Sequence, residues 1–265
     1  MSQGFRRRVI DRDGVRLGYL DNDAAGPVVV MLHGLAGTGD EFTATAEAVG
    51  GLNRFILPDL RGHGASMRRP ADLSRAAFTG DVAALIRHVS PGRPVALAGQ
   101  SMGGHTAVLA TAACPQLVER LVVLEATVAG ATDPARIGNY FRSWPLPFAS
   151  ATAALEFLGN DALSRSWAAH LEPAESGGLV PPFDADVMEA IMTGLAEPQW
   201  ARWRSVTVPV TAVFAAESMF SPGEQAEFVA ARPGTRHVVL RSGSHDAHLD
   251  ATAEWAEALR GALAG

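Results

Sequence analysis

Short apolar runs alternate with longer stretches of helical periodicity along most of this chain. The runs are rich in Val, Ile, Leu and Ala, and they occur at residues 28–32, 54–58, 94–98, 120–124 and 208–214. A continuous apolar run of this length fits a strand that is buried on both faces, as in a parallel sheet. Residues 74–89 and 106–113 instead suit helices, the first with one apolar face and the second buried. The pattern predicts an α/β fold with a mostly parallel central sheet and helices on both faces.

The ends of the chain add further elements around this core. Residues 5–21 predict a hairpin, and residues 236–241 predict a last strand before an amphipathic terminal helix. Asp40 follows a glycine-rich loop and is placed to cap a helix over residues 41–49. Alternating strand and helix patterns therefore lie on both sides of residues 127–204, which lack that alternation.

Composition limits the size and the partners of the protein. The 265 residues, 48% of them hydrophobic and 19% charged, suffice for one sizeable α/β core with a small insertion. The net charge is −6 and there is no basic stripe, so we expect no nucleic-acid partner. The single cysteine, Cys114, excludes an internal disulfide and a cysteine-based metal site. No signal-peptide pattern or run of bilayer-spanning length is present, so we expect a cytoplasmic protein without a membrane partner.

The most informative motif lies at residues 99–103, which read Gly-Gln-Ser-Met-Gly. An apolar strand precedes it and an apolar helix follows it, which is the context of a nucleophile elbow. Such a sharp turn strains the backbone of the serine, so Gly99 and Gly103 are needed on either side. The alternative is a chance pattern in a glycine-rich chain, and the flanking elements favour the elbow. Ser101 is therefore the candidate nucleophile.

A glycine-rich loop at residues 33–39 follows the strand at 28–32. A phosphate-binding loop is disfavoured, because neither Gly-Lys-Ser/Thr nor the Gly-x-Gly-x-x-Gly spacing is present. The loop fits an oxyanion hole better, with the N–H groups of Leu35 and Met102 directed at one point. We expect His33 to fix the loop through a hydrogen bond.

A cluster of charged and polar residues at 59–66 invites interpretation as a metal site or a catalytic site. It reads Asp-Leu-Arg-Gly-His-Gly-Ala-Ser. The glycines on both sides of His63 indicate a tightly packed turn instead, in which the polar groups bond one another. We predict a structural role for this cluster.

Taken together, these motifs identify a family resemblance. A strand followed by His33-Gly34, a strand followed by residues 59–64, and the elbow resemble the α/β-hydrolase superfamily in order and spacing. The resemblance covers residues 5–126 and again 206–263. It implies an α/β-hydrolase core of residues 1–126 plus 205–265, with a helical cap inserted at 127–204.

The inserted segment carries helical patterns with Pro and Trp breaks, and no strand-like run interrupts them. In the resembled fold such an insertion covers the nucleophile. Phe141, Trp144 and Phe148 are then candidates for the substrate pocket. The alternative is that these aromatic residues pack the cap onto the core.

The resemblance places a general base in the loop between the last strand and the last helix. His245 fits this position best. His248 lies three residues further along, and we expect it to pack against or cap the terminal helix.

The third member of the expected triad is missing from its usual place. Most proteins of this fold carry an Asp shortly after the strand at 210–214, whereas Ser218 occupies that position here. Glu217 is one alternative. Glu125 ends the strand after the elbow helix, where some relatives, including certain haloalkane dehalogenases, carry their acid. We favour Glu125; its other interpretation is a carboxylate that ties the cap hinge to a backbone amide.

The serine nucleophile implies acyl transfer through an acyl-enzyme. We predict a serine hydrolase of a small ester, thioester or lactone that requires no metal or organic cofactor. A C–C bond hydrolase, a hydroxynitrile lyase or a perhydrolase would use the same residues, and a degenerate relative would bind a ligand without turnover. The partner is a small acyl substrate, and the sequence carries no signal for an oligomeric state.

Overall fold

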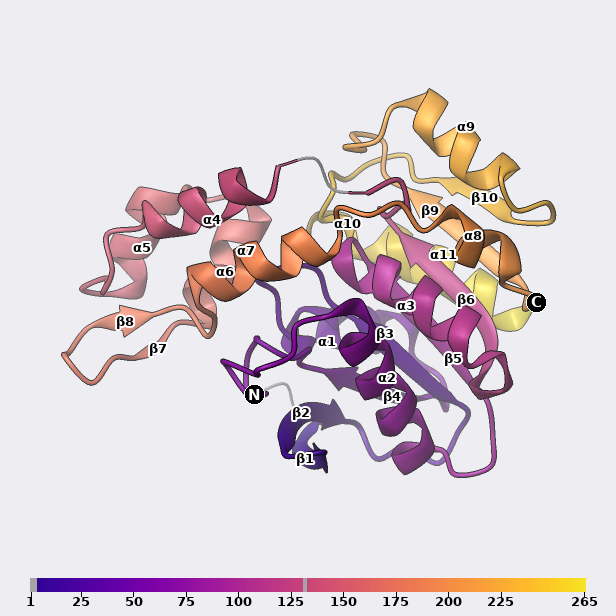
Figure 1. The fold of residues 1–265 in the computed structure, drawn as a ribbon, viewed down its shortest axis with the longest axis horizontal. Coiled ribbons are helices and arrows are strands. Elements are labelled where there is room, and N and C mark those ends of the chain that lie inside the picture. The colour runs from indigo at the N-terminus through magenta and orange to yellow at the C-terminus, as the bar shows by residue number, and fades with distance from the viewer. Residues whose placement is uncertain (1–3, 131–132) are drawn as a thin grey trace.

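The computed structural model describes residues 4–130 and 133–265, and its centre is a mostly parallel sheet. Within these residues eight strands lie in the order β1-β2-β4-β3-β5-β6-β9-β10 (Figure 1). β1 and β2 form the predicted antiparallel hairpin, β2 is antiparallel to β4, and the remaining neighbours are parallel. The predicted fold class is therefore confirmed. The strands are β1 (Arg6–Arg12), β2 (Val15–Asp21), β3 (Val28–Leu32), β4 (Arg54–Pro58), β5 (Val95–Gln100), β6 (Val118–Leu124), β9 (Val210–Phe214) and β10 (Arg236–Val239).

Helices cover both faces of this sheet and create two apolar cores. One core contains side chains of α2, α3, α8 and α9, and the other contains side chains of α1, α10 and α11. β5 lies between these cores and every one of its residues is buried, which explains its uninterrupted apolar run. The helices are α1 (Thr43–Val49), α2 (Arg75–Val89), α3 (Met102–Ala113), α8 (Trp200–Ser205), α9 (Pro222–Ala230), α10 (Ala247–Asp250) and α11 (Thr252–Ala264), with 3₁₀ turns η1 (Gly39–Phe42) and η2 (Pro115–Leu117).

Strand register brings the ends of the central strands to one edge of the sheet. Gly99 on β5 pairs with Leu32 at the end of β3, and Gln100 pairs with Leu124 at the end of β6. Leu124 in turn pairs with Val213 on β9. Because parallel strands end together, the loops that follow β3, β5, β6 and β9 meet at this edge.

The segment between β6 and β9 forms a separate group of helices beside the sheet (Figure 1). It contains α4 (Pro134–Arg142), α5 (Ala151–Leu158), α6 (Ala162–Ala169) and α7 (Ala185–Gly194). The expectation that no strand interrupts it is wrong, because β7 (Glu172–Pro173) and β8 (Leu179–Val180) pair as a short hairpin. Two-residue strands are too short to produce a recognisable alternation in the sequence. α8, at the end of this segment, packs against α3, and its Trp203 stacks on Phe228 with ring centroids 4.2 Å apart.

The predicted cap at Asp40 is also wrong. Asp40 lies inside η1, and Thr38, which has no side-chain capping bond, precedes that turn. The Asp40 carboxylate instead accepts a hydrogen bond from Arg7 on β1 at 2.6 Å. Tertiary pairing with the neighbouring strand therefore decides where this side chain lies.

Candidate active site

Ser101 lies between β5 and α3 in a strained conformation, with φ 51° and ψ −121°. Its flanking glycines have no room for a side chain. A Cβ on Gly99 would lie 2.3 Å from the carbonyl oxygen of Gly103, and a Cβ on Gly103 would lie 2.2 Å from that of Leu32. The sharp turn and the positive φ are therefore a property of the packing around the elbow.

The loop between β10 and α10 brings His245 to this serine. Nε2 of His245 lies 2.9 Å from Oγ of Ser101. The loop is held in place by Gln100, whose side-chain amide donates to the backbone carbonyl of His245 at 2.8 Å. Sequence reasoning missed this role of Gln100, because nothing local to residue 100 indicates a partner 145 residues away.

The other ring nitrogen of His245 faces Glu125. Oε2 of Glu125 lies 3.2 Å from Nδ1 of His245, and Oε1 accepts a hydrogen bond from the Ala215 N–H at 2.8 Å. Glu125 follows β6 directly with φ 48°, and its side chain has no exposed surface. A buried carboxylate needs such donors, and an imidazole between it and the serine is held in one orientation.

Glu217, the alternative acid, lies elsewhere. Its side chain is exposed, and its backbone N–H donates to the carbonyl of Gly243 at 3.0 Å. The structure therefore brings together Ser101, His245 and Glu125, and it leaves Glu217 at the surface.

Leu35 and Met102 lie on the two segments that flank the serine. Met102 is the first residue of α3, so its N–H has no carbonyl to bond within the helix. Gly34, just before Leu35, touches the elbow so closely that a Cβ there would lie 2.3 Å from Oε1 of Gln100 and 3.5 Å from Cβ of Ser101. The glycine-rich loop therefore runs beside the nucleophile, as an oxyanion hole requires.

Two buried histidines hold this loop in place. The Nδ1 of His33 lies 2.7 Å from the Gly34 carbonyl, and its Nε2 accepts from the Leu60 N–H at 2.9 Å. The Nε2 of His63 accepts from the Ala36 N–H at 3.1 Å. Burial, with a smaller effect of His33, lowers the pKa of His63 to about 3, so its ring is neutral at ordinary pH. The expected structural role of His33 agrees with these contacts.

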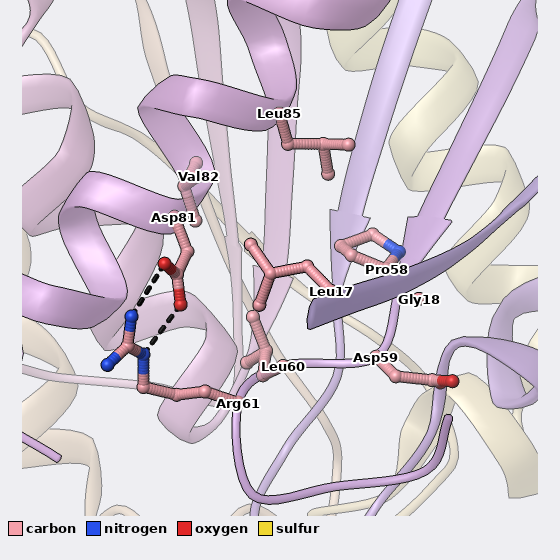
Figure 2. A pocket seen from close by; sticks show the side chains of 9 residues that line it. All are labelled: Leu17, Gly18, Pro58, Asp59, Leu60, Arg61, Asp81, Val82 and Leu85. Atoms are coloured by element: carbon pink, nitrogen blue, oxygen red, sulfur yellow. Dashed lines mark hydrogen bonds and ion pairs between the residues drawn. The ribbon is translucent and has the colours of Figure 1, made fainter. Parts of the chain in front are cut away.

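Asp59 and Arg61 of the 59–66 cluster also have hydrogen-bond partners, inside the cluster and on neighbouring elements. Asp59 accepts from the N–H groups of Gly39 and Ala65 at 2.8 and 2.9 Å. Arg61 donates two hydrogen bonds of 2.6 Å to the carboxylate of Asp81 (Figure 2). The pair lies beside a cavity of only about 10 Å³. That volume holds no more than about one water molecule. These contacts support the structural interpretation of the cluster.

His248 does not contact the serine. It is buried on α10, where its Nε2 lies 3.3 Å from Oε2 of Glu41 and its ring stands 5.0 Å from that of Phe42. The second oxygen of Glu41 accepts from Ser166 on α6 at 3.1 Å. Burial alone would raise the pKa of Glu41, but His248 and its other partners lower it below the ordinary value. The pair thus joins α10 and η1 to a helix of the inserted segment.

The three predicted pocket residues are Phe141, Trp144 and Phe148, and all are buried. Trp144 lies within ring contact of both phenylalanines, with centroids 5.4 and 6.0 Å apart, so they form one aromatic cluster of the inserted segment. Phe141 also borders a groove of about 330 Å³ that Arg68 helps to line. A role for these rings in substrate binding stays a prediction.

Two other features of the described residues bear on function. None of their helices is both long and apolar enough to cross a membrane. Residues 4–130 and 133–265 also contain no cluster of His, Cys, Asp and Glu suited to holding a metal ion.

Comparison with known proteins shows that this chain is similar to hydrolases. The model of the alpha/beta hydrolase family matches residues 29–258. An sn-1-specific diacylglycerol lipase of Mus musculus is 38% identical over 123 residues, which are 46% of this chain and 39% of the lipase. The chain thus matches well under half of that relative's length.

A second relative matches nearly end to end. The 2-(acetamidomethylene)succinate hydrolase of Mesorhizobium japonicum is 25% identical over 253 residues, covering 92% of this chain and 90% of that enzyme. A crystal structure of E-2-(acetamidomethylene)succinate hydrolase gives a TM-score of 0.89 at 23% identity, with 98% and 100% of the two chains covered. The structural likeness concerns the fold.

Proposed function

Because the chain belongs to the alpha/beta hydrolase family, we propose that it is a serine hydrolase that cleaves a small ester, thioester or lactone through an acyl-enzyme on Ser101. One observation carries the proposal. Nε2 of His245 lies 2.9 Å from the Ser101 hydroxyl while its Nδ1 faces the buried Glu125 carboxylate at 3.2 Å. A hydroxyl, an imidazole and a carboxylate in this sequence of contacts form the arrangement that activates a serine for acyl transfer.

In the first step Ser101 attacks the carbonyl carbon of the substrate and His245 accepts the hydroxyl proton on Nε2. Glu125 then stabilises the imidazolium, because its carboxylate faces the protonated Nδ1. The carbonyl oxygen becomes an oxyanion, which the N–H groups of Leu35 and Met102 bind. Each such donor contributes about 3 kcal/mol to the transition state in comparable sites.

The intermediate collapses when His245 returns the proton to the leaving alcohol, thiol or alkoxide. Water then attacks the acyl-Ser101 carbonyl, and His245 takes a proton from that water as it did from the serine. The second intermediate releases a carboxylic acid and restores the Ser101 hydroxyl. In a lactone the leaving alkoxide stays attached to the acyl group, so the product is one hydroxy acid.

An amide-like acyl compound is a second candidate substrate. The relative that matches nearly end to end is named for the hydrolysis of an acetamido compound. The same residues suffice for that chemistry, because His245 can protonate a leaving nitrogen as readily as a leaving oxygen. The reaction type then stays acyl transfer and only the leaving group changes.

Labelling with a fluorophosphonate probe tests the proposal. We expect wild-type protein to be labelled at neutral pH, Ser101→Ala to be unlabelled and His245→Ala to be labelled far more slowly. Ser218→Ala is the matched control, because that serine binds the N–H of Phe220 and faces neither His245 nor Glu125 in its contacts. Absence of labelling in a folded wild-type protein would contradict the proposal and favour a ligand-binding relative without turnover.

A further inference from the structure

Arg75, the first residue of α2, is only partly exposed, and its guanidinium has no acidic partner among the described residues. Its Nη2 donates to Oγ1 of Thr106 on α3. Its Nε and Nη1 are buried, and no hydrogen-bond acceptor reaches them within the described residues. The guanidinium carbon lies 4.2 Å from the ring centroid of Phe78, and this contact with an aromatic face offsets only part of the cost of burying the charge.

His105, next to Thr106, adds a second unsatisfied group at the same place. Its side chain is 5% exposed, and neither ring nitrogen has a partner in the part of the chain that the structure describes. Arg75 and His105 together hold four of the ten buried side-chain atoms that lack a partner among those residues. Native proteins pair almost all such atoms, so a concentration of them at one place indicates a missing ligand or water.

Arg61 is a buried arginine whose charge is paired with a carboxylate of the same chain. Two of its nitrogens contact the carboxylate of Asp81 at 2.6 Å (Figure 2). Burial, with a contribution from the charge of Arg61, lowers the pKa of Arg75 to about 9. Burial and then the charge of Arg75 lower the pKa of His105 to about 3. Arg75 therefore keeps its charge at neutral pH beside a neutral His105, and no carboxylate among the described residues pairs with it.

This group is linked to the first turn of α3, which begins directly after the nucleophile. Oγ1 of Thr106, which accepts from Arg75, donates in turn to the carbonyl of Met102 at 2.8 Å, and Met102 follows Ser101 directly. Thr106 is five residues beyond Ser101, so the helical rise separates them by about 7–8 Å along the axis. A Cβ on Gly194, at the end of α7, would lie 3.4 Å from Cδ of Arg75, so the side chain stands where core and inserted segment meet.

We propose that Arg75, with His105 and Thr106 beside it, forms a subsite for a carboxylate carried by the substrate, so that the preferred substrate is the monoester or a related acyl derivative of a short dicarboxylic acid. The reaction itself rests on the proposed function. Arginine binds a carboxylate through charge-assisted hydrogen bonds, and Nε and Nη1 of Arg75 are two donors left without a partner among the described residues.

Two esters of equal chain length test this subsite. Mono-p-nitrophenyl glutarate carries the carboxylate, and p-nitrophenyl valerate replaces it with a methyl group. We expect wild-type kcat/KM to favour the glutarate ester, and we expect Arg75→Gln to lower the glutarate-to-valerate ratio by about 10- to 100-fold. Arg87→Gln, which removes an exposed arginine from the other end of α2, should leave the ratio as in wild type. An unchanged ratio in Arg75→Gln, or equal losses on both esters, would overturn the subsite.

Arg75→Met keeps the test decisive if the glutamine variant folds poorly. A buried charge without a partner costs stability, so an apolar side chain of similar length should leave Tm unchanged or raise it while the preference for glutarate disappears. A clear fall in Tm together with loss of both activities would show a structural role for Arg75 and overturn the inference.

Direct binding measurements distinguish the carboxylate subsite from the serine hydrolase proposal. They also distinguish a substrate carboxylate from a free inorganic anion. Glutarate titrated into Ser101→Ala protein should bind, and binding should weaken when Arg75→Gln is added. Arg75-dependent binding of glutarate without fluorophosphonate labelling of wild type would leave the subsite standing and remove the proposed function. Labelling of wild-type Ser101 together with glutarate binding that does not depend on Arg75 would do the reverse. Binding of phosphate or chloride but not glutarate would identify a free inorganic ion and overturn the substrate assignment.

Discussion

Nδ1 of His245 stands 3.2 Å from Oε2 of Glu125, although 120 residues separate the two in the chain. The glutamate has no exposed surface, and its other oxygen is held by the Ala215 N–H. This carboxylate fixes which way the imidazole faces, and thereby which nitrogen meets Ser101.

Replacing Glu125 with Gln should nearly abolish turnover while the protein stays folded. The neutral amide does not hold the Nδ1–H of His245 in the same orientation or stabilise the imidazolium charge, and we expect kcat to fall by about 10³- to 10⁴-fold. Glu217→Gln is the matched control and should act like wild type, because its side chain is exposed. Hydrolysis of p-nitrophenyl acetate measures both. Near-normal turnover by Glu125→Gln with a collapse in Glu217→Gln would show that the acid has been misassigned.

A methyl group at Gly103 should destroy the elbow. A Cβ there would lie 2.2 Å from the Leu32 carbonyl and 2.5 Å from that of His33, and backbone cannot move aside cheaply. We expect Gly103→Ala to lower the free energy of unfolding by about 3 kcal/mol or more and to abolish fluorophosphonate labelling. Gly223→Ala, also near the start of a helix, meets nothing closer than 3.9 Å and should leave stability nearly unchanged. Urea unfolding compares the two, and a stable, labelled Gly103→Ala protein would refute the packing argument.

His63 should make the protein less stable as the solution becomes acidic. Its folded pKa is lowered to about 3, first by burial and then by His33, whereas an unfolded histidine titrates near about 6.5. Below pH ~6.5 the unfolded chain gains a proton that the folded chain does not. The stabilisation is therefore complete above pH ~6.5 and is lost as the pH falls toward about 3, at up to about 1.4 kcal/mol per pH unit.

Unfolding in urea at a series of pH values checks this prediction. His63→Gln should be less stable than wild type at pH ~7.5, because the Ala36 N–H loses a well-placed acceptor. Its stability should also fall less steeply on acidification. His88→Gln, which replaces an exposed histidine on α2, should keep the wild-type slope. Identical slopes for wild type and His63→Gln would contradict the assignment.

Local pattern was enough to predict the strands of the sheet and the elbow. The central strands carry mostly apolar runs, and the strand, glycines and helix around Ser101 are neighbours in sequence. The cap predicted at Asp40 failed because its side chain bonds Arg7, 33 residues away. Sequence pattern predicts contacts between residues close in the chain. It does not show when a residue distant in the chain takes a side chain's hydrogen bond instead.

The choice between Glu125 and Glu217 depended on which carboxylate lies near His245, and the sequence alone does not show that. β6 and β9 pair side by side, and the Ala215 N–H, just past the end of β9, turns onto the Glu125 carboxylate. Two residues later Glu217 has already turned outward. Arg75 and His105 were missed for a similar reason, because only the tertiary structure shows which of their buried nitrogens lack a partner among the described residues.

The most direct test of the account is to identify the residue that carries the acyl group during turnover. Wild-type protein mixed with p-nitrophenyl acetate, quenched in acid and digested should yield an acetylated peptide with the modification on Ser101, and Ser101→Ala should yield none. Turnover by wild type with the acetyl group on another residue, or unaffected turnover by Ser101→Ala, would contradict the account.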